Sequence, residues 1–97
     1  MRTAVIKKKP NEKFAVGFRY STADLAKDST ISTVEVTITP SGNASDLTVV
    51  GSPAKDDYVV SAMLQKGVDG VEYFVSFKTT TSAGQVFQDT IFVKVRS

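Results

Sequence analysis

The stretch VDGVEYFVSFKTTTSAGQVFQDTIFVKVRS, residues 68–97, carries the clearest structural pattern in the chain. Apolar and polar side chains alternate along two runs, and a short segment of small residues separates the runs. Alternation with a period of two is typical of a half-buried β-strand. Ser82, Ala83 and Gly84 fit a three-residue hairpin loop, because such loops favour a glycine with positive φ at the last position. The stretch therefore predicts an antiparallel hairpin.

The loop fixes the register of this hairpin. Counting outward from it pairs Tyr73 with Val93 and Val75 with Ile91. Both strands then turn their apolar faces to the same side, and this agreement supports the register, because a slip of one residue would separate the two faces.

Tyr73 follows a corner that contains Gly70. A tyrosine that begins the penultimate strand of a sandwich, just after such a corner, resembles a tyrosine corner, in which the ring is buried and the hydroxyl bonds to upstream backbone. We therefore expect Tyr73, Gly70 and Gly84 to have structural roles. The alternative for Tyr73 is a plain core residue with its hydroxyl in water.

The rest of the chain shows turn signals about every 8–12 residues, a spacing typical of all-β sandwiches and barrels. Residues 21–30 fit a helical turn with Leu25 facing inward. The further strands that we expect are residues 3–8, 13–20, 31–39, 47–50 and 57–65. We predict a single domain over residues 1–97, an immunoglobulin-like antiparallel β-sandwich of about seven strands with one short helical turn.

Composition excludes several kinds of site. The 97 residues include no histidine and no cysteine, so a Ser-His-Asp or Cys-His catalytic site and a zinc site of imidazole or thiolate ligands are excluded. Asp56, Asp57 and Asp69 can be imagined around a calcium ion, but acidic residues in turns more often bond to nearby backbone. We expect no enzymatic activity, no cofactor and folding without metal.

Charge gives little indication of a nucleic-acid or membrane partner. The net charge is +2, and the basic residues are spread along the chain apart from Lys7, Lys8 and Lys9. We interpret this run as the solvated end of a strand that discourages edge pairing. We expect no specific nucleic-acid binding and no membrane segment, because no apolar run is long enough for a transmembrane helix.

An aromatic pair is the most unusual surface feature. The hairpin register places Phe74 opposite Phe92 on the face away from the core, among polar neighbours. Paired aromatics ringed by polar residues suggest a protein interface, with Lys78, Lys94 and Arg96 as a basic rim. Two alternatives stay open: the pair can stabilise the hairpin by itself, or an N-terminal strand or loop can cover it.

Three segments together resemble a known group of phage proteins. They are DLAKDSTI at 24–31, STVEVTITPSG at 32–42 and LQKGVDGVEYFVSFKTTTSAGQVFQDTIFVKV at 64–95. The chain resembles small tailed-bacteriophage virion proteins that are encoded among head and tail assembly genes and are sometimes labelled fibre-tail adaptors. It departs from the pattern at Phe74 and Phe92, where we would expect polar residues.

The resemblance implies a virion structural protein with no catalytic residues. It implies binding to other virion proteins of the tail, portal or fibre, association of copies within the virion, and synthesis in the bacterial cytoplasm, where a lack of cysteine fits reducing conditions. The alternatives are a carbohydrate-binding or adhesin-type sandwich and a chaperone-like or regulatory binding protein. A glycan array and the identity of adjacent genes would separate these classes.

Overall fold

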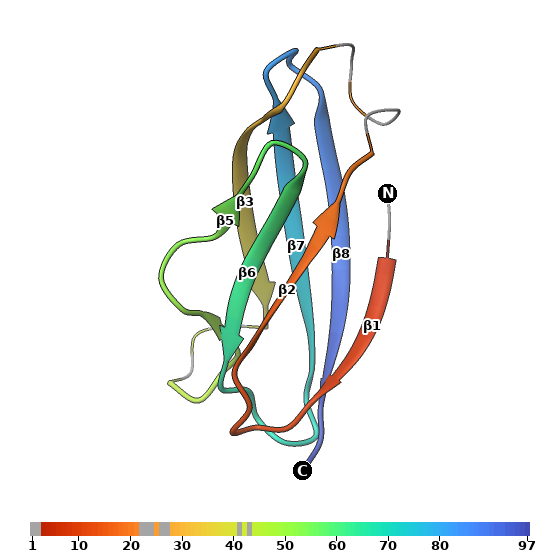
Figure 1. The fold of residues 1–97 in the computed structure, drawn as a ribbon. Helices are drawn as coiled ribbons and strands as arrows, with labels where there is room; N and C mark the ends of the chain where they lie inside the picture. Colours follow the sequence, from red (N-terminus) through yellow and green to blue (C-terminus); the bar gives the residue numbers. More distant parts are fainter. Residues whose placement is uncertain (1–2, 22–24, 26–27, 41, 43) are drawn as a thin grey trace.

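Two β-sheets pack face to face in the computed structural model, which describes residues 3–21, 25, 28–40, 42 and 44–97 (Figure 1). The first sheet has the order β1-β8-β7-β3, and the second has the order β2-β6-β4, with β5 also paired to β6. The strands are β1 (Thr3–Lys8), β2 (Phe14–Arg19), β3 (Ile31–Thr39), β4 (Thr48–Val49), β5 (Ala54–Lys55), β6 (Val59–Gln65), β7 (Glu72–Thr81) and β8 (Val86–Val95).

The prediction of an all-β sandwich is confirmed. β1 and β3 begin and end at the expected residues, whereas β5 was not expected, so the described residues form eight strands. Half of the helical turn predicted for residues 21–30 lies outside the described residues, including Ala26, which was expected to face inward with Leu25, and Leu25 is buried as expected. In an immunoglobulin fold the third, sixth and seventh strands lie in one sheet, and the second and fifth strands lie in the other. The immunoglobulin-like assignment of this chain stays a prediction.

The carboxyl-terminal hairpin has the predicted register. Tyr73 pairs with Val93 and Phe74 pairs with Phe92. Gly84 has a φ of 85° at the last position of the loop, a conformation that a residue without Cβ adopts at little cost. The inward side chains of this hairpin are fully or almost fully buried: Tyr73, Val75, Phe77, Ile91, Val93 and Val95.

The second sheet depends on one glycine. Gly17 in β2 lies opposite Ser61 in β6, and a Cβ at this position would lie 2.0 Å from the carbonyl oxygen of Val60 and 2.8 Å from the Cα of Ser61. Both of these atoms are backbone, so no rotation of a side chain can relieve the clash. Glycine therefore lets the two strands approach closely enough to pair.

Tyr73 links the first sheet to the segment that precedes β4. Its side chain is fully buried, and its hydroxyl donates a hydrogen bond to Oδ1 of Asp46 at 2.8 Å. The same hydroxyl accepts a hydrogen bond from the backbone N–H of Val68 at 3.0 Å, which is the upstream partner expected of a tyrosine corner. Burial raises the pKa of the Tyr73 hydroxyl above its usual range.

A second tyrosine makes a link in the opposite direction. Tyr20, which follows β2, is buried, and its hydroxyl donates to the carboxylate of Asp89 in β8. The hydroxyl of Thr79 in β7 lies 3.2 Å from the Tyr20 hydroxyl. Asp89 is therefore a buried acidic residue within a strand, which the sequence analysis did not identify.

Replacing Tyr73 with phenylalanine tests the first link. Tyr73→Phe removes the hydroxyl that donates a hydrogen bond to Asp46 and accepts one from Val68. We therefore expect the unfolding free energy to fall by about 1–3 kcal/mol. Chemical denaturation measures this loss. Tyr58→Phe is the matched control, because Tyr58 is 38% exposed, and a change there should stay within about 0.5 kcal/mol. Equal effects of the two changes would contradict a structural role for the Tyr73 hydroxyl.

Adding a single methyl group at Gly17 tests the close approach of β2 and β6. Gly17→Ala should lower the unfolding free energy by about 1–3 kcal/mol, the usual cost of overpacking, because the new Cβ meets backbone. A thermal melt of Gly17→Ala that matches the unmodified chain would contradict the close packing.

Candidate interaction surface

The outer face of the first sheet carries the predicted aromatic pair. Phe74 is 41% exposed and lies opposite the half-buried Phe92. The two ring centroids are 5.1 Å apart and the ring planes are perpendicular, an edge-to-face geometry worth about 0.5–1.5 kcal/mol beyond the burial of area. The pair therefore stabilises the hairpin and still leaves apolar surface in water.

Val5 in β1 extends the pair into a row. β1 runs parallel to β8 and places Val5 opposite Phe92, with the Val5 side chain 61% exposed. The N-terminal strand thus lies beside the aromatic pair in the same sheet and does not cover it (Figure 1). We call Val5, Phe92 and Phe74 the apolar row.

Lysine side chains stand beside the apolar row. Lys7 and Lys94 face each other across β1 and β8, one row further along the sheet, and Glu72 lies opposite Lys94 on β7. Side chains of one face that are two residues apart along a strand are separated by about 7 Å. Lys94 is therefore a close neighbour of Phe92, and Lys7, which the sequence analysis did not include in the rim, belongs to the same border.

The other two predicted rim residues are less close. Lys78 is four residues from Phe74 on β7, about 13 Å along the strand, and lies opposite Gln88. Arg96 follows β8, and its guanidinium donates a hydrogen bond to the carbonyl of Val95 at 2.8 Å. The structure thus brings together Phe74, Phe92 and Lys94 of the predicted set, while Lys78 and Arg96 are peripheral.

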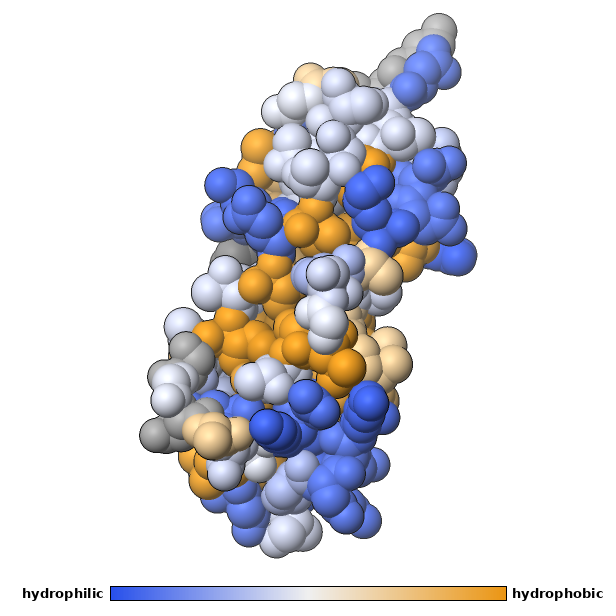
Figure 2. All heavy atoms as spheres, turned by 90° about the vertical axis from the view of Figure 1, so that its left-hand side faces the viewer, coloured by the Kyte–Doolittle hydropathy of each residue, from blue (hydrophilic) through white to orange (hydrophobic). Residues whose placement is uncertain are grey.

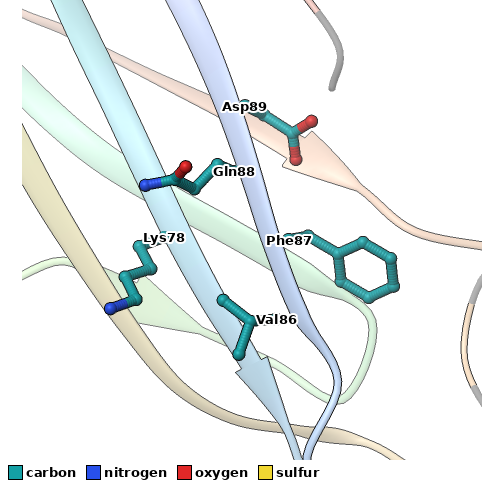
Figure 3. Close-up of a pocket in the computed structure, with 5 residues that line it drawn as sticks. All are labelled: Lys78, Val86, Phe87, Gln88 and Asp89. Atoms are coloured by element: carbon teal, nitrogen blue, oxygen red, sulfur yellow. The ribbon is translucent and has the colours of Figure 1, made fainter.

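A shallow hollow lies at the loop end of the same sheet. Its lining residues are Lys78, Val86, Phe87, Gln88 and Asp89. Figure 3 shows Phe87 and Asp89 pointing to the opposite side of β8 from Lys78 and Gln88. The carboxylate of Asp89 is buried and accepts the hydrogen bond of the Tyr20 hydroxyl. The acidic group of this hollow therefore stabilises the fold.

The basic run near the N-terminus is not uniformly solvated. Lys7 and Lys9 are exposed, but Lys8 is 1% exposed because its alternation turns it inward. Its ammonium group donates to the carbonyl oxygens of Lys9 at 2.9 Å and Lys66 at 2.5 Å. Burial lowers the pKa of Lys8, and the nearby carboxylate of Glu12 partly opposes that shift. The interpretation of the run as a solvated strand end is therefore wrong for Lys8.

The three acidic residues considered for calcium do not meet. Asp57 lies before β6 and Asp69 lies after it, and a strand of this length separates its ends by roughly 20 Å. Asp69 instead accepts hydrogen bonds from the backbone and hydroxyl of Ser97, which lower the pKa of its carboxyl group. Among the described residues, no group of acidic side chains is arranged to hold a metal ion.

No helix within the described ranges is long and apolar enough to cross a membrane.

Comparison with known families shows which family the chain resembles. A family model described as "Podophage GP4 fiber-tail adaptor protein gp77" matches residues 8–94 of the chain. The matched range includes Phe74, Phe92 and both buried tyrosines, and it leaves Val5 outside. No curated protein matches the chain at a significant level.

Chemical labelling tests the burial of Lys8. We expect an amine-acetylating reagent to modify Lys7 and Lys9 rapidly in the folded protein and to modify Lys8 at least tenfold more slowly. The burial of the Lys8 ammonium group and its bonds to carbonyl oxygens oppose access, although its lowered pKa alone would favour reaction. Mass spectrometry of the labelled peptides measures the three rates, with urea-unfolded protein as the reference. Equal rates in the folded protein would show that Lys8 is solvated.

Proposed function

This chain belongs to the podophage GP4 fiber-tail adaptor family, and we propose that it binds other virion proteins through the outer face of its first sheet. Within this proposal it is a non-enzymatic module of the phage particle, made in the host cytoplasm and carried in the virion. Its partners are proteins of the tail, the portal region or the fibres.

The apolar row is the observation that carries the proposal. Phe74 and Val5 are 41% and 61% exposed although each belongs to a regular strand. Burying such a side chain on a partner contributes up to about 1.5–3 kcal/mol. Three neighbouring apolar side chains can therefore form the centre of a small interface, which the polar neighbours Ser76 and Thr90 would border.

The charges around the row favour a particular kind of partner. Lys7 and Lys94 border it on one side, and Glu72 is the one acidic neighbour in that row among the described strands. An acidic rim on the partner would complement these lysines and would mainly increase the rate and selectivity of association. We therefore propose a partner surface with an apolar centre and carboxylates at the end facing Lys94.

A carbohydrate partner fits this face less well. The rings of Phe74 and Phe92 are perpendicular, so they do not form one flat platform for a sugar ring. Their nearest polar neighbours along the strands, Ser76 and Thr90, face each other with hydroxyl oxygens 3.4 Å apart. The face thus offers a sugar few side chains for hydrogen bonding. Protein binding is the function that its geometry supports best.

The double change Phe74→Ser with Phe92→Thr tests the proposal. We expect the protein to remain folded, since the inward core is unchanged, with a loss of about 0.5–1.5 kcal/mol from the missing ring contact. We expect incorporation of the protein into particles to fall at least tenfold. The measurement is the yield of infectious particles and the content of this chain in purified particles, using a phage that depends on the supplied gene.

Val86→Ser is the matched control. Val86 is 54% exposed on the same face of β8, but it lies six residues from Phe92, about 20 Å along the strand. Its replacement should leave incorporation unchanged. If the double variant folds and is incorporated normally, the outer face is not the binding surface. If the double variant unfolds, the phenyl pair belongs to the fold, and the proposal fails in its present form.

A further inference from the structure

Within the part of the chain that the structure describes, β3 leaves one long edge of the first sheet unpaired. It pairs with β7 on one side and is the last strand in the order of its sheet. At its start, the N–H of Ile31 donates to the carbonyl of Asp57 at 3.0 Å, and the register shifts between Ile31 and Thr33. At its end stands Pro40, which has no N–H to offer a neighbouring strand. β5 lies near β3, but among the described residues only β7 pairs with residues 33–39, so the free edge runs over residues 33–39.

This edge lacks the usual protection against pairing. Natural edge strands are commonly guarded by lysines, prolines or bulges along their length. Residues 33–39 contain one charged side chain, Glu35, and it lies opposite Lys78 of the same chain. All the other residues of the segment are threonine, valine or isoleucine, which favour strands. By contrast, β1 at the opposite edge of the sheet carries Lys7 and Lys8.

The inward side of β3 is also incompletely covered. Val34, Val36 and Ile38 are half-buried, whereas inward residues of β7 such as Val75 and Phe77 are fully buried. Beside β6, the second sheet reaches this corner with the two-residue strands β4 and β5. A hollow lined by residues of β3 and by Leu47, Thr48 and Val49 remains there. Figure 2 shows apolar atoms gathered along the middle of this side of the molecule.

We propose that β3 pairs with β3 of a second copy of this chain, antiparallel, with Val36 opposite Val36 of the second copy. The free edge determines this register, because Val36 is the midpoint of residues 33–39 and only this alignment pairs the whole edge with itself. A two-fold axis through the midpoint relates the copies, as in the commonest kind of soluble homo-oligomer.

The side chains agree with this register. On the inward face, Val34 of one copy meets Ile38 of the other, and the two Val36 side chains meet at the axis. On the outward face, Glu35 meets Thr37 of the second copy, so no like charges face each other. A shift by two residues in either direction would leave part of residues 33–39 unpaired, and in one direction it would set Glu35 against Glu35, which is unfavourable. A shift by one would put apolar side chains against the polar face.

The pairing would join two four-stranded sheets into one continuous sheet. The outward faces of both copies would then lie on the same side, so the dimer would present two apolar rows to its partners. Linked contacts strengthen binding without any new contact at either site. This consequence rests on the proposed function, whereas the pairing itself does not.

Cysteine cross-linking tests the register directly, because the chain has no cysteine of its own. Under mild oxidation, Val36→Cys should form a covalent dimer on a non-reducing gel. Val34→Cys is the matched control on the same strand and face. In the proposed register the two copies of residue 34 are four residues apart along the strands, about 13 Å, which is beyond the reach of a disulfide.

Charge changes at Thr37 test the same register in solution. Thr37 is exposed on the outward face and would lie opposite Glu35 of the second copy. Thr37→Lys should tighten the dimer about fivefold through two cross-strand ion pairs, and Thr37→Glu should weaken it by a similar factor. Sedimentation equilibrium measures the dissociation constant against the 10.4 kDa mass of one chain. Gln88→Glu adds the same charge away from the edge and should have no effect.

Three results would overturn the proposal. One is an unmodified chain that stays monomeric up to millimolar concentration. Another is cross-linking of Val34→Cys as fast as Val36→Cys. The third is a pair of Thr37 variants that shift the dissociation constant in the same direction while both melt like the unmodified chain. A change in partner binding by the Phe74 and Phe92 double variant, with its dimer intact, would bear on the proposed function alone.

Discussion

Two buried hydrogen bonds from tyrosine to aspartate hold the sheets of this sandwich against each other. Tyr73 on the first sheet donates to Asp46, which lies just before the second sheet's β4, and Tyr20 beyond β2 donates to Asp89 on the first sheet. A chain of 97 residues with no cysteine has no disulfide to fix the two layers. A buried carboxylate without a donor is costly, so each pair disfavours arrangements in which the sheets slide or separate.

This fixed packing supports the proposed role of the first sheet as a binding platform. The inward faces of β7 and β8 are closed by the core, so the outward side chains of these strands hold defined positions. The perpendicular contact of Phe74 and Phe92 limits the motion of two side chains that keep apolar surface in water, which lowers the entropy that would be lost when a partner covers them. An assembly protein gains from such a surface, because a small interface must bind without a large rearrangement.

Much of this arrangement could be predicted from the sequence, and the part that could not has a physical reason. The loop at Gly84 determined the hairpin register, and the register determined that Phe74 faces Phe92. Asp89 is two residues from Ile91 and therefore lies on the same, inward face of β8, so the alternation of the strand predicts that Asp89 is buried. β1 pairs in parallel with β8, and this pairing brings Val5 to the apolar row. The alternation of apolar residues could not predict it, because alternation shows which side chains share a face of the sheet but not which strands are neighbours. Lys8 followed its strand inward for the same reason as Asp89, and the bonds of its ammonium group to Lys9 and Lys66 depend on where distant turns meet.

The central claim is that the outer face of the first sheet is covered in the assembled particle. An electron cryomicroscopy reconstruction of the phage at side-chain detail would test it most directly. The account predicts that another virion protein buries Val5, Phe74 and Phe92, with carboxylates near Lys94, while Tyr20 and Tyr73 keep their aspartate partners. A reconstruction in which these three side chains face solvent and the chain is held by other surfaces would contradict it.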